Sequence, residues 1–279
     1  MSENQKVSVV TGSSSGIGYE TALILARNGF KTYATMRNTE KGVSLSSIAE
    51  KEDLSIKIVQ LDVTDQNSVK NAVEKIHDES RKIDILINNA GYGLVGALED
   101  IPMEEIKSQF ETNFYGLIRV TQAVLPIMRR QGSGKIVNIS SGAGRFGFPT
   151  GSIYVSTKFA VEGLSESLAY EVEPFGIKII LVEPGVIKTN FFNASNTTKK
   201  SLNPDSPYFK VFQNMESGFS KMLENGSTPD LVAKTVLEAI STDAPKLRYL
   251  AGNDVKQLLE GKKNMSDEDF FNMMKQNMF

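Results

Sequence analysis

Apolar residues in this chain occur in short, β-branched runs that alternate with longer amphipathic stretches. Nearly continuous apolar runs are typical of parallel strands buried on both faces of a sheet. They predict strands at Val7–Thr11, Thr32–Met36, Ile56–Leu61, Ile83–Asn88, Ile136–Ser140 and Ile177–Glu183, with a seventh candidate at Leu247–Leu250. The stretches between them predict helices at Ile17–Asn28, Asn67–Ser80, Met103–Arg130 and Ser156–Val172. This alternation predicts a doubly wound, parallel α/β sheet of about seven strands with helices on both faces.

Two segments depart from this alternation. Asn190–Thr228 has no strand pattern and follows the sixth strand, at the edge where open α/β sheets bind their ligands. It is too apolar for a simple spacer, so we expect a substrate lid at about residues 190–228 rather than a surface insertion. Its apolar residues are Phe191, Phe192, Phe209, Phe212, Met215 and Phe219. The amphipathic tail, Asp267–Phe279, is expected to pack on the body or on a partner subunit. No linker divides residues 1–279, which predicts a single domain.

The composition excludes several classes of function. The chain has 279 residues and a net charge of −2, which gives no electrostatic reason to bind nucleic acid or an anionic membrane. No apolar run approaches the roughly 18 residues of a membrane span, and the N-terminus lacks a signal-peptide pattern, so we expect a cytoplasmic protein. It has no cysteine, and its one histidine, His77, lies among charges on a predicted helix. We therefore expect neither a metal site nor a histidine-dependent triad.

A glycine-rich turn, TGSSSGIG, follows the first strand and opens the first helix. Gly12 allows a tight turn, Gly16 allows the backbone to approach a pyrophosphate, and Gly18 allows close packing of helix on strand. The N–H groups and positive dipole end of the helix then face the phosphates. This strand–turn–helix context predicts a Rossmann-type dinucleotide site. Its residues are Gly12, Ser13, Ser14, Ser15, Gly16, Ile17 and Gly18.

The end of the second strand predicts the choice of cofactor. An acidic residue there would bind the ribose hydroxyls of NAD, but the sequence has Arg37, which can pair with the 2′-phosphate of NADP(H). A second basic residue just before Gly16 would strengthen this preference, and Ser15 occupies that position. The alternative is a solvated surface arginine. We predict NADP(H).

Other strand ends supply weaker candidates for cofactor contacts. The Asp62 carboxylate, with Val63 beside it, can accept the adenine amino group, although a strand-ending Asp or Asn is more often a cap. Small residues after the fourth strand let the backbone meet the adenosine ribose, and an asparagine there can join neighbouring strand ends. Backbone after the sixth strand could bond the nicotinamide carboxamide and the pyrophosphate. These residues are Asn89, Ala90, Gly91, Pro184, Gly185, Ile187 and Thr189.

Tyr154 and Lys158 carry the predicted chemistry. Four residues apart on a helix, they face the same side, and the ammonium should lower the pKa of the phenol from about 10. Such a phenol can exchange a proton with a carbonyl or alcohol oxygen. Ser141, at the end of the fifth strand, can hold that oxygen. Asn113 lies mid-helix, where an amide is locally unfavourable, and either supports a proton relay or is a buried structural amide.

Together these motifs resemble the short-chain dehydrogenase/reductase family. TGxxxGxG, NNAG, a mid-helix Asn, Ser-x12-Tyr-x3-Lys and PGxxxT occur in the family's order and spacing over about residues 6 to 190. FKTYATMRN, KFAVEGLSESLAYEVEPFGIKI and KLRYL are similar to the branch with hydroxysteroid and retinol dehydrogenases. The resemblance implies a catalytic tetrad of Asn113, Ser141, Tyr154 and Lys158, with Tyr154 and Lys158 also contacting the cofactor. It also implies a homodimer or homotetramer that pairs the helices Met103–Arg130 and Ser156–Val172.

The sequence therefore predicts an NADP(H)-dependent enzyme that interconverts a carbonyl and an alcohol on a partly apolar small molecule. Phe146, Phe148 and the lid phenylalanines are the predicted pocket walls. One alternative is a short-chain semialdehyde reductase, whose substrate would need a fixed cation. Arg145 and Lys188 are the nearest candidates by sequence. Another alternative is a non-catalytic NADP(H)-sensing regulator, which the intact Ser, Tyr and Lys disfavour. A dehydratase or dehalogenase would not need the glycine-rich cradle.

Overall fold

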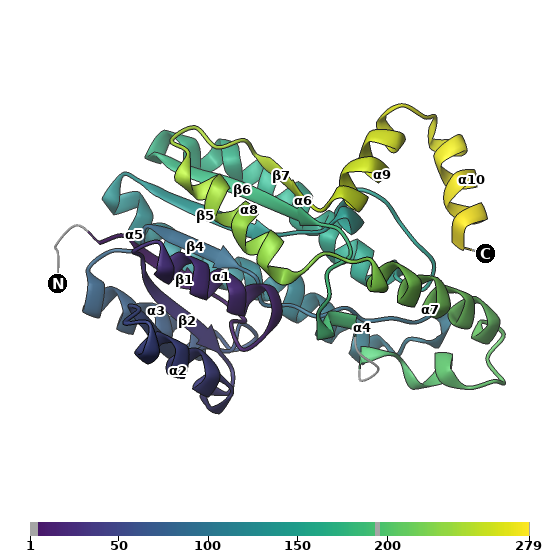
Figure 1. The fold of residues 1–279 in the computed structure, drawn as a ribbon, viewed down its shortest axis with the longest axis horizontal. Helices are drawn as coiled ribbons and strands as arrows, with labels where there is room; N and C mark the ends of the chain where they lie inside the picture. Colours follow the sequence, from purple (N-terminus) through teal and green to yellow (C-terminus); the bar gives the residue numbers. More distant parts are fainter. Residues whose placement is uncertain (1–4, 193–195, 279) are drawn as a thin grey trace.

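The computed structural model describes residues 5–192 and 196–278. Its strands form a seven-stranded sheet in the order β3-β2-β1-β4-β5-β6-β7 (Figure 1), and every neighbouring pair is parallel. The strands are β1 Val7–Val10, β2 Lys31–Met36, β3 Ile56–Gln60, β4 Ile85–Asn88, β5 Gly134–Ile139, β6 Ile177–Pro184 and β7 Arg248–Ala251. The predicted fold class is confirmed, including the seventh strand.

Helices cover both faces of the sheet, as the continuous apolar strands require. Along β1, Val9 packs into the core that α3, α5 and α6 cover, whereas Val10 packs into the core that α1, α2 and α8 cover. Both side chains are fully buried. The helices are α1 Gly16–Arg27, α2 Val43–Lys51, α3 Gln66–Ser80, α4 Met103–Phe110, α5 Gly116–Gln131, α6 Ser152–Val172, α7 Phe209–Glu224, α8 Pro229–Ser241, α9 Asn253–Lys263 and α10 Asp267–Met278.

The predicted helix Met103–Arg130 is wrong as a single α-helix. A π-helical turn at Glu111–Tyr115 separates α4 from α5, and Asn113 lies at its centre. The Asn113 side chain bonds the backbone of Tyr92 through both of its polar atoms. Inserted turns of this kind are frequent at functional sites. The locally unfavourable asparagine was the signal for this break.

Three further helices, α2, α8 and α9, were not predicted. The start of α8 carries a signal in the sequence, because Thr228 precedes Pro229 at the first helical position. Another unpredicted helix, α7, lies inside the segment expected to form the lid. Residues 193–195 of that segment, and Phe279 of the tail, lie outside the described residues.

Polar side chains join the carboxyl ends of the central strands. Asn89, after β4, donates from Nδ2 to the carbonyl oxygens of Thr11 (2.9 Å) and Gly12 (3.1 Å), after β1. Asn88 donates to Asn138 of β5 at 2.9 Å. The predicted role of an asparagine in tying strand ends is confirmed. These bonds fix the loops at the edge of the sheet beyond which α7, α9 and α10 lie (Figure 1).

The tail packs on the body, as expected. Phe270 and Met274 of α10 are buried, and the ring of Phe270 meets Phe146 edge-on with centroids 6.2 Å apart. Phe146 follows β5 in the chain, so α10 reaches back to the loop that carries Ser141. None of the described helices is both long and apolar enough to cross a lipid bilayer.

Candidate active site

A large cleft runs along the carboxyl edge of the sheet, with a volume of about 1960 Å³. It is lined by the glycine-rich turn, the ends of β2 to β6, α7 and the α9–α10 pair. Ligands bind at this edge in doubly wound sheets. The cleft joins the predicted cofactor residues to the predicted catalytic residues.

The glycine-rich turn has the geometry of a phosphate cradle. Gly12 and Gly16 have φ of +69° and +59°, a left-handed backbone that side chains disfavour. A Cβ on Gly12 would lie 2.8 Å from the Cα of Ala90, and one on Gly18 would lie 2.4 Å from the Gly12 carbonyl oxygen. The turn can therefore pack against β4 and start α1 only with glycine at these positions. The helix N-terminus that it opens suits a dinucleotide pyrophosphate.

Ser13 was predicted to contact the cofactor, but the structure places it outside the cleft lining. Its side chain is fully buried, and its hydroxyl donates to the carbonyl oxygen of Val10 at 2.9 Å. Its own N–H bonds the carbonyl oxygen of Thr35, so it joins β1 to β2. Ser13 supports the turn from below and does not line the cleft, whereas Ser14 and Ser15 do.

Two exposed cations lie at the end of the cleft beside β2, where the sequence predicts the adenosine of the cofactor. Arg37 follows β2, and Lys41 lies one turn further on, in the short helical turn Thr39–Gly42. Both line the cleft, together with Asn38. Lys41 was not recognised from the sequence, although its position four residues after Arg37 was the available signal. Asp62 also lines the cleft, but its Oδ1 accepts from the N–H (2.9 Å) and hydroxyl (2.8 Å) of Thr64 and so caps its own loop.

The structure brings Ser141, Tyr154 and Lys158 together at the centre of the cleft. Ser141 follows β5 and caps the short turn after it, accepting from the N–H of Ala143 at 3.1 Å. Tyr154 and Lys158 lie one turn apart on α6, with the Lys158 Nζ 5.9 Å from the centroid of the Tyr154 ring. The Lys158 ammonium donates to the carbonyl oxygen of Ile139, at the end of β5, at 2.8 Å. This bond fixes α6 against the end of β5, beside Ser141.

Aromatic rings cover Tyr154, which is 4% exposed. Phe191 and Phe192 meet its ring edge-on, with centroids 5.5 and 5.1 Å away. This burial raises the pKa of Tyr154 to about 12, and the Ser141 hydroxyl opposes the rise. The predicted lowering of this pKa is therefore wrong for the protein alone, because the loss of water around the phenol dominates. Burial likewise lowers the pKa of Lys158 to about 8, against the charge of Glu162.

Asn113 does not line the cleft. Its Oδ1 accepts from the N–H of Tyr92 at 3.1 Å, and its Nδ2 donates to the Tyr92 carbonyl oxygen at 2.9 Å. A third contact, to the Thr157 hydroxyl at 3.4 Å, reaches the residue before Lys158. The side chain matches the structural alternative, and its part in a proton relay stays a prediction.

Asp254 is a site residue that the sequence did not reveal. It lies at the start of α9, lines the cleft, and accepts from the N–H of Val186 at 2.7 Å through Oδ2. A Cβ on Gly185 would lie 2.2 Å from the same atom, so the carboxylate closes tightly on the loop after β6. Because 68 residues separate the partners, no local pattern could indicate the contact.

Most of the predicted cofactor residues line one cleft. Those that do are Gly12, Ser14, Ser15, Gly16, Ile17, Arg37, Asp62, Val63, Asn89, Ala90, Gly91, Tyr154, Lys158, Pro184, Gly185, Ile187 and Thr189. Ser13 and Gly18 support the turn without reaching it. His77 lies on α3, away from the cleft, and the described residues contain no cluster of metal ligands.

Comparison with known proteins assigns the family. Residues 6–200 match the model of the short chain dehydrogenase family. This span holds the cradle, Ser141, Tyr154 and Lys158. The chain therefore belongs to the short-chain dehydrogenase/reductase family of oxidoreductases, whose members bind nicotinamide cofactors.

Individual relatives match over most of their length. An uncharacterized oxidoreductase of Bacillus subtilis, YusZ, is 42% identical, with 92% of each chain covered. Human retinol dehydrogenase 8 is 37% identical, with 86% of this chain and 79% of that protein covered. A short-chain dehydrogenase structure from Streptomyces avermitilis superposes with a TM-score of 0.84 at 34% identity, over 99% of this chain and 98% of the other. The predicted likeness to retinol dehydrogenases is confirmed.

Proposed function

We propose that this enzyme is an NADP(H)-dependent oxidoreductase that interconverts a carbonyl and an alcohol on a partly apolar small molecule. The observation that carries the proposal is the meeting of Ser141, Tyr154 and Lys158 between a phosphate cradle and an apolar pocket wall. This arrangement supplies a proton donor, a donor to hold the substrate oxygen, and a cation, without a metal.

The residues of this chain have distinct roles in the proposed reduction. Bound NADPH would supply a hydride to the carbonyl carbon. The Ser141 hydroxyl holds and polarises the carbonyl oxygen, and Tyr154 gives that oxygen its phenolic proton. A Tyr154 pKa of about 12 keeps the phenol protonated at neutral pH, which suits an acid in the direction of reduction. Lys158 places its charge beside the phenol and would hold the nicotinamide ribose.

Two cations in the cleft favour NADP(H) over NAD(H). Arg37 and Lys41 both line the adenosine end of the cleft, and charge-assisted pairs with a phosphate are stronger than neutral hydrogen bonds. The turn Arg37–Lys41 does contain one acid, Glu40. Its N–H bonds the Asn38 side chain, and it is absent from the cleft lining.

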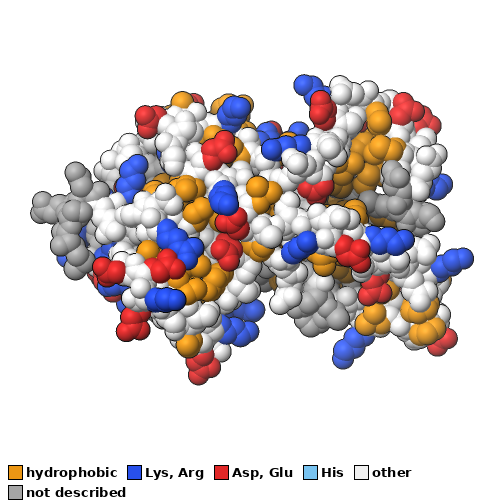
Figure 2. Space-filling model, viewed as in Figure 1, with side chains coloured by type: hydrophobic (Ala, Val, Ile, Leu, Met, Phe, Trp, Pro, Cys, Tyr) orange, Lys and Arg blue, Asp and Glu red, His pale blue; other side chains and the backbone are white. Residues whose placement is uncertain are grey.

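The substrate end of the cleft supports an apolar substrate. Its walls carry Phe146, Phe148, Phe191, Phe192, Met215, Phe219, Leu258, Met273 and Met274. Figure 2 shows apolar side chains gathered between α9 and α10. Arg145 forms an ion pair with Glu183 at 3.2 Å, and neither it nor Lys188 lines the cleft. The similar retinol dehydrogenase is named for an apolar alcohol.

We also propose that the chain forms one catalytic domain whose lid includes α7. Asp100 anchors the part of this lid segment just before α7, since its Oδ2 accepts from the hydroxyls of Ser201 (3.0 Å) and Ser206 (2.6 Å). Met215 and Phe219 of α7 face the cleft. Because Phe191 and Phe192 cover Tyr154, a substrate reaches the phenol only when these rings move.

A carbonyl series tests the proposed substrate class. With NADPH saturating, kcat/KM should rise as the apolar chain or ring of an aldehyde or ketone grows, because each buried Å² contributes about 25 cal/mol. Steady-state oxidation of NADPH measures each member. Short carboxylated aldehydes serve as the contrast. If these were preferred, the enzyme would be a semialdehyde reductase, and Lys221, the cation on the lid that lines the cleft, would be the first residue to replace.

We further propose a cytoplasmic homodimer or homotetramer formed through α5 and α6. On these helices, Val124, Leu117 and Leu168 are buried in the core of the subunit and are not available to an interface. Phe159 and Tyr170 of α6 and Tyr115 beside α5 are exposed, at 46%, 81% and 51%. Exposed aromatic residues of this kind are enriched in subunit interfaces.

Light scattering at micromolar concentration should give a mass of two or four subunits. Phe159→Glu should lower that mass, since it places a charge in the interface. Val43→Glu, at another exposed apolar residue, on α2, should not. A monomer mass for the unaltered protein would contradict the proposed assembly.

A further inference from the structure

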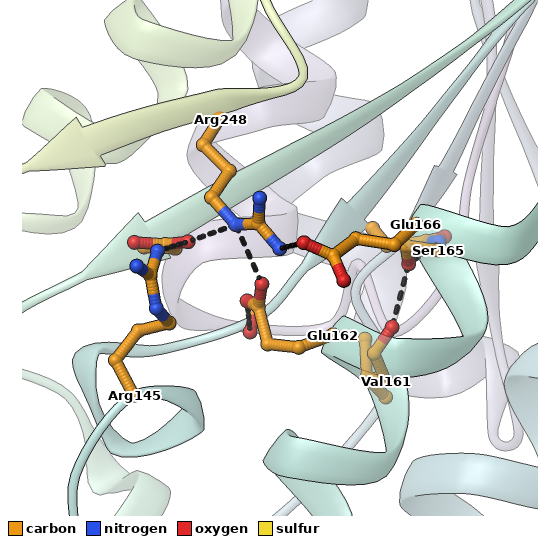
Figure 3. Close-up of polar contacts among 9 residues, drawn as sticks. Arg145, Val161, Glu162, Ser165, Glu166 and Arg248 are labelled. Carbon is orange, nitrogen blue, oxygen red and sulfur yellow. Dashed lines mark hydrogen bonds and ion pairs between the residues drawn. The ribbon is translucent and has the colours of Figure 1, made fainter. Parts of the chain in front are cut away.

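A group of charged side chains lies directly behind the candidate active site. Arg248 of β7 lies at its centre, with its Nε 2.9 Å from Glu162 and 3.0 Å from Glu183, and its Nη2 2.7 Å from Glu166 (Figure 3). Arg145 also pairs with Glu183, at 3.2 Å. Glu183 is fully buried at the end of β6, just before the cofactor loop. The mechanism proposed above uses none of these groups.

Glu162 links this charged group to the candidate catalytic residues. It lies one turn after Lys158 on α6 and is 5% exposed. Its Oε1 accepts from the hydroxyl of Ser140, while its Oε2 faces Arg248. Ser140 stands between Ile139, whose carbonyl oxygen accepts from Lys158, and Ser141. The Glu162 carboxylate therefore contacts the end of β5. That strand end holds Lys158 through the Ile139 carbonyl oxygen and carries the Ser141 hydroxyl.

We propose that Glu162 is a positioning residue, which fixes the end of β5 through Ser140 and so sets Ser141 and Lys158 in register. This proposal rests on the function proposed above. Arg248 stabilises the buried Glu162 carboxylate, because a buried carboxylate without a partner is strongly destabilising.

The charges facing Glu162 come from every element around it. Lys158 and Glu166 share α6, Arg248 lies on β7, Glu183 on β6, and Arg145 on the loop after β5. Burial lowers the pKa of Lys158 to about 8, and the charge of Glu162 raises it. Burial, and then Glu162, raise the pKa of Glu183. Removing the Glu162 charge should therefore lower the pKa of Lys158 further and lower that of Glu183.

The matched pair Glu162→Gln and Glu166→Gln tests the proposal. Both replace a carboxylate on Arg248, but Glu166 is half exposed and bonds no residue at the end of β5. Ser140→Ala removes only the hydroxyl contact and leaves the Glu162 charge. Thermal unfolding of each variant checks that the fold is kept, and Ser140→Ala remains informative if Glu162→Gln does not fold.

The first readout is kcat/KM for NADPH against pH, which reports groups of the free enzyme. For the unaltered enzyme it should fall above about pH 8, where Lys158 loses its proton. In Glu162→Gln this fall should begin at lower pH, and kcat should drop by up to about 100-fold through misplacement of Ser141. Ser140→Ala should lower kcat while leaving the pH of the fall unchanged. Glu166→Gln should change neither.

The second readout is independent of the proposed reaction. The ¹³Cε shift of Lys158, assigned by comparison with Lys158→Arg, should titrate near pH 8 and move to lower pH in Glu162→Gln only. A Glu162→Gln variant that matches Glu166→Gln in both the titration and kcat would overturn the proposal. A titration that moves as expected in a protein that reduces no carbonyl would instead overturn the proposed function.

Discussion

Replacing Tyr154 by phenylalanine is expected to lower kcat for carbonyl reduction by about 10²- to 10⁴-fold, the range of general-acid effects. Only the phenolic hydroxyl is lost, so the edge-on packing against Phe191 and Phe192 should persist. NADPH affinity should stay near that of the unaltered enzyme. Single-turnover oxidation of NADPH measures the chemical step, and fluorescence titration measures cofactor binding.

Lys158→Ala is the contrasting variant. It removes the charge beside the phenol, the bond to the Ile139 carbonyl oxygen and the proposed ribose contact, so both kcat and NADPH affinity should fall. If Tyr154→Phe kept more than a few per cent of the rate, roughly the smallest general-acid effect, Tyr154 would not be the general acid. Unchanged NADPH affinity in Lys158→Ala would show that Lys158 does not hold the nicotinamide ribose.

Arg37→Asp is expected to swing cofactor preference toward NADH. The change removes a partner of the 2′-phosphate and adds repulsion, which is how specificity is commonly built. A hydrogen bond to a charged group contributes about 1.5–3 kcal/mol, so the ratio of kcat/KM for NADPH to that for NADH should fall roughly 10- to 100-fold. Lys41→Ala should lower the same ratio by a smaller factor, since it removes a cation without adding repulsion.

Arg130→Asp makes the same change of charge at an exposed position on α5, away from the cleft. It should leave the ratio unaltered. An unaltered ratio in Arg37→Asp as well would show that Arg37 does not read the 2′-phosphate. Lys41 and Asn38, which share that end of the cleft, would then be the residues to replace.

The parallel sheet could be predicted because its signal is local. Buried parallel strands such as Ile177–Pro184 read as continuous apolar runs, and the crossover helices between them have the opposite pattern. Helix α7 was missed even though Phe212, Met215, Phe219 and Met222 recur at helical spacing, so its period was an available signal. The break at Glu111–Tyr115 depends on the bonds of Asn113 to Tyr92, 21 residues away, and a helical pattern cannot indicate such a contact.

The candidate site likewise has residues that the sequence reveals and features that depend on distant contacts. Short sequence motifs identify Gly12, Ser141, Tyr154 and Lys158. Ser13 belongs to the same motif, but its hydroxyl turns to Val10, and only the three-dimensional path of the turn decides this. The pKa of Tyr154 depends on rings that lie 37 and 38 residues further along the chain. Burial of that kind cannot be derived from the spacing of Tyr154 and Lys158.

In the proposed reaction, this site passes a hydride from NADPH to a carbonyl carbon while Tyr154 supplies the proton. The most direct test of this reaction is the reduction of a long-chain aldehyde with NADPH deuterated at the reactive C4 position, followed by mass spectrometry of the alcohol. We predict one deuterium on the carbinol carbon, and none when the label is on the solvent instead. An alcohol without the cofactor's deuterium, or NADPH that binds and is never oxidised by any carbonyl of the series, would contradict the account.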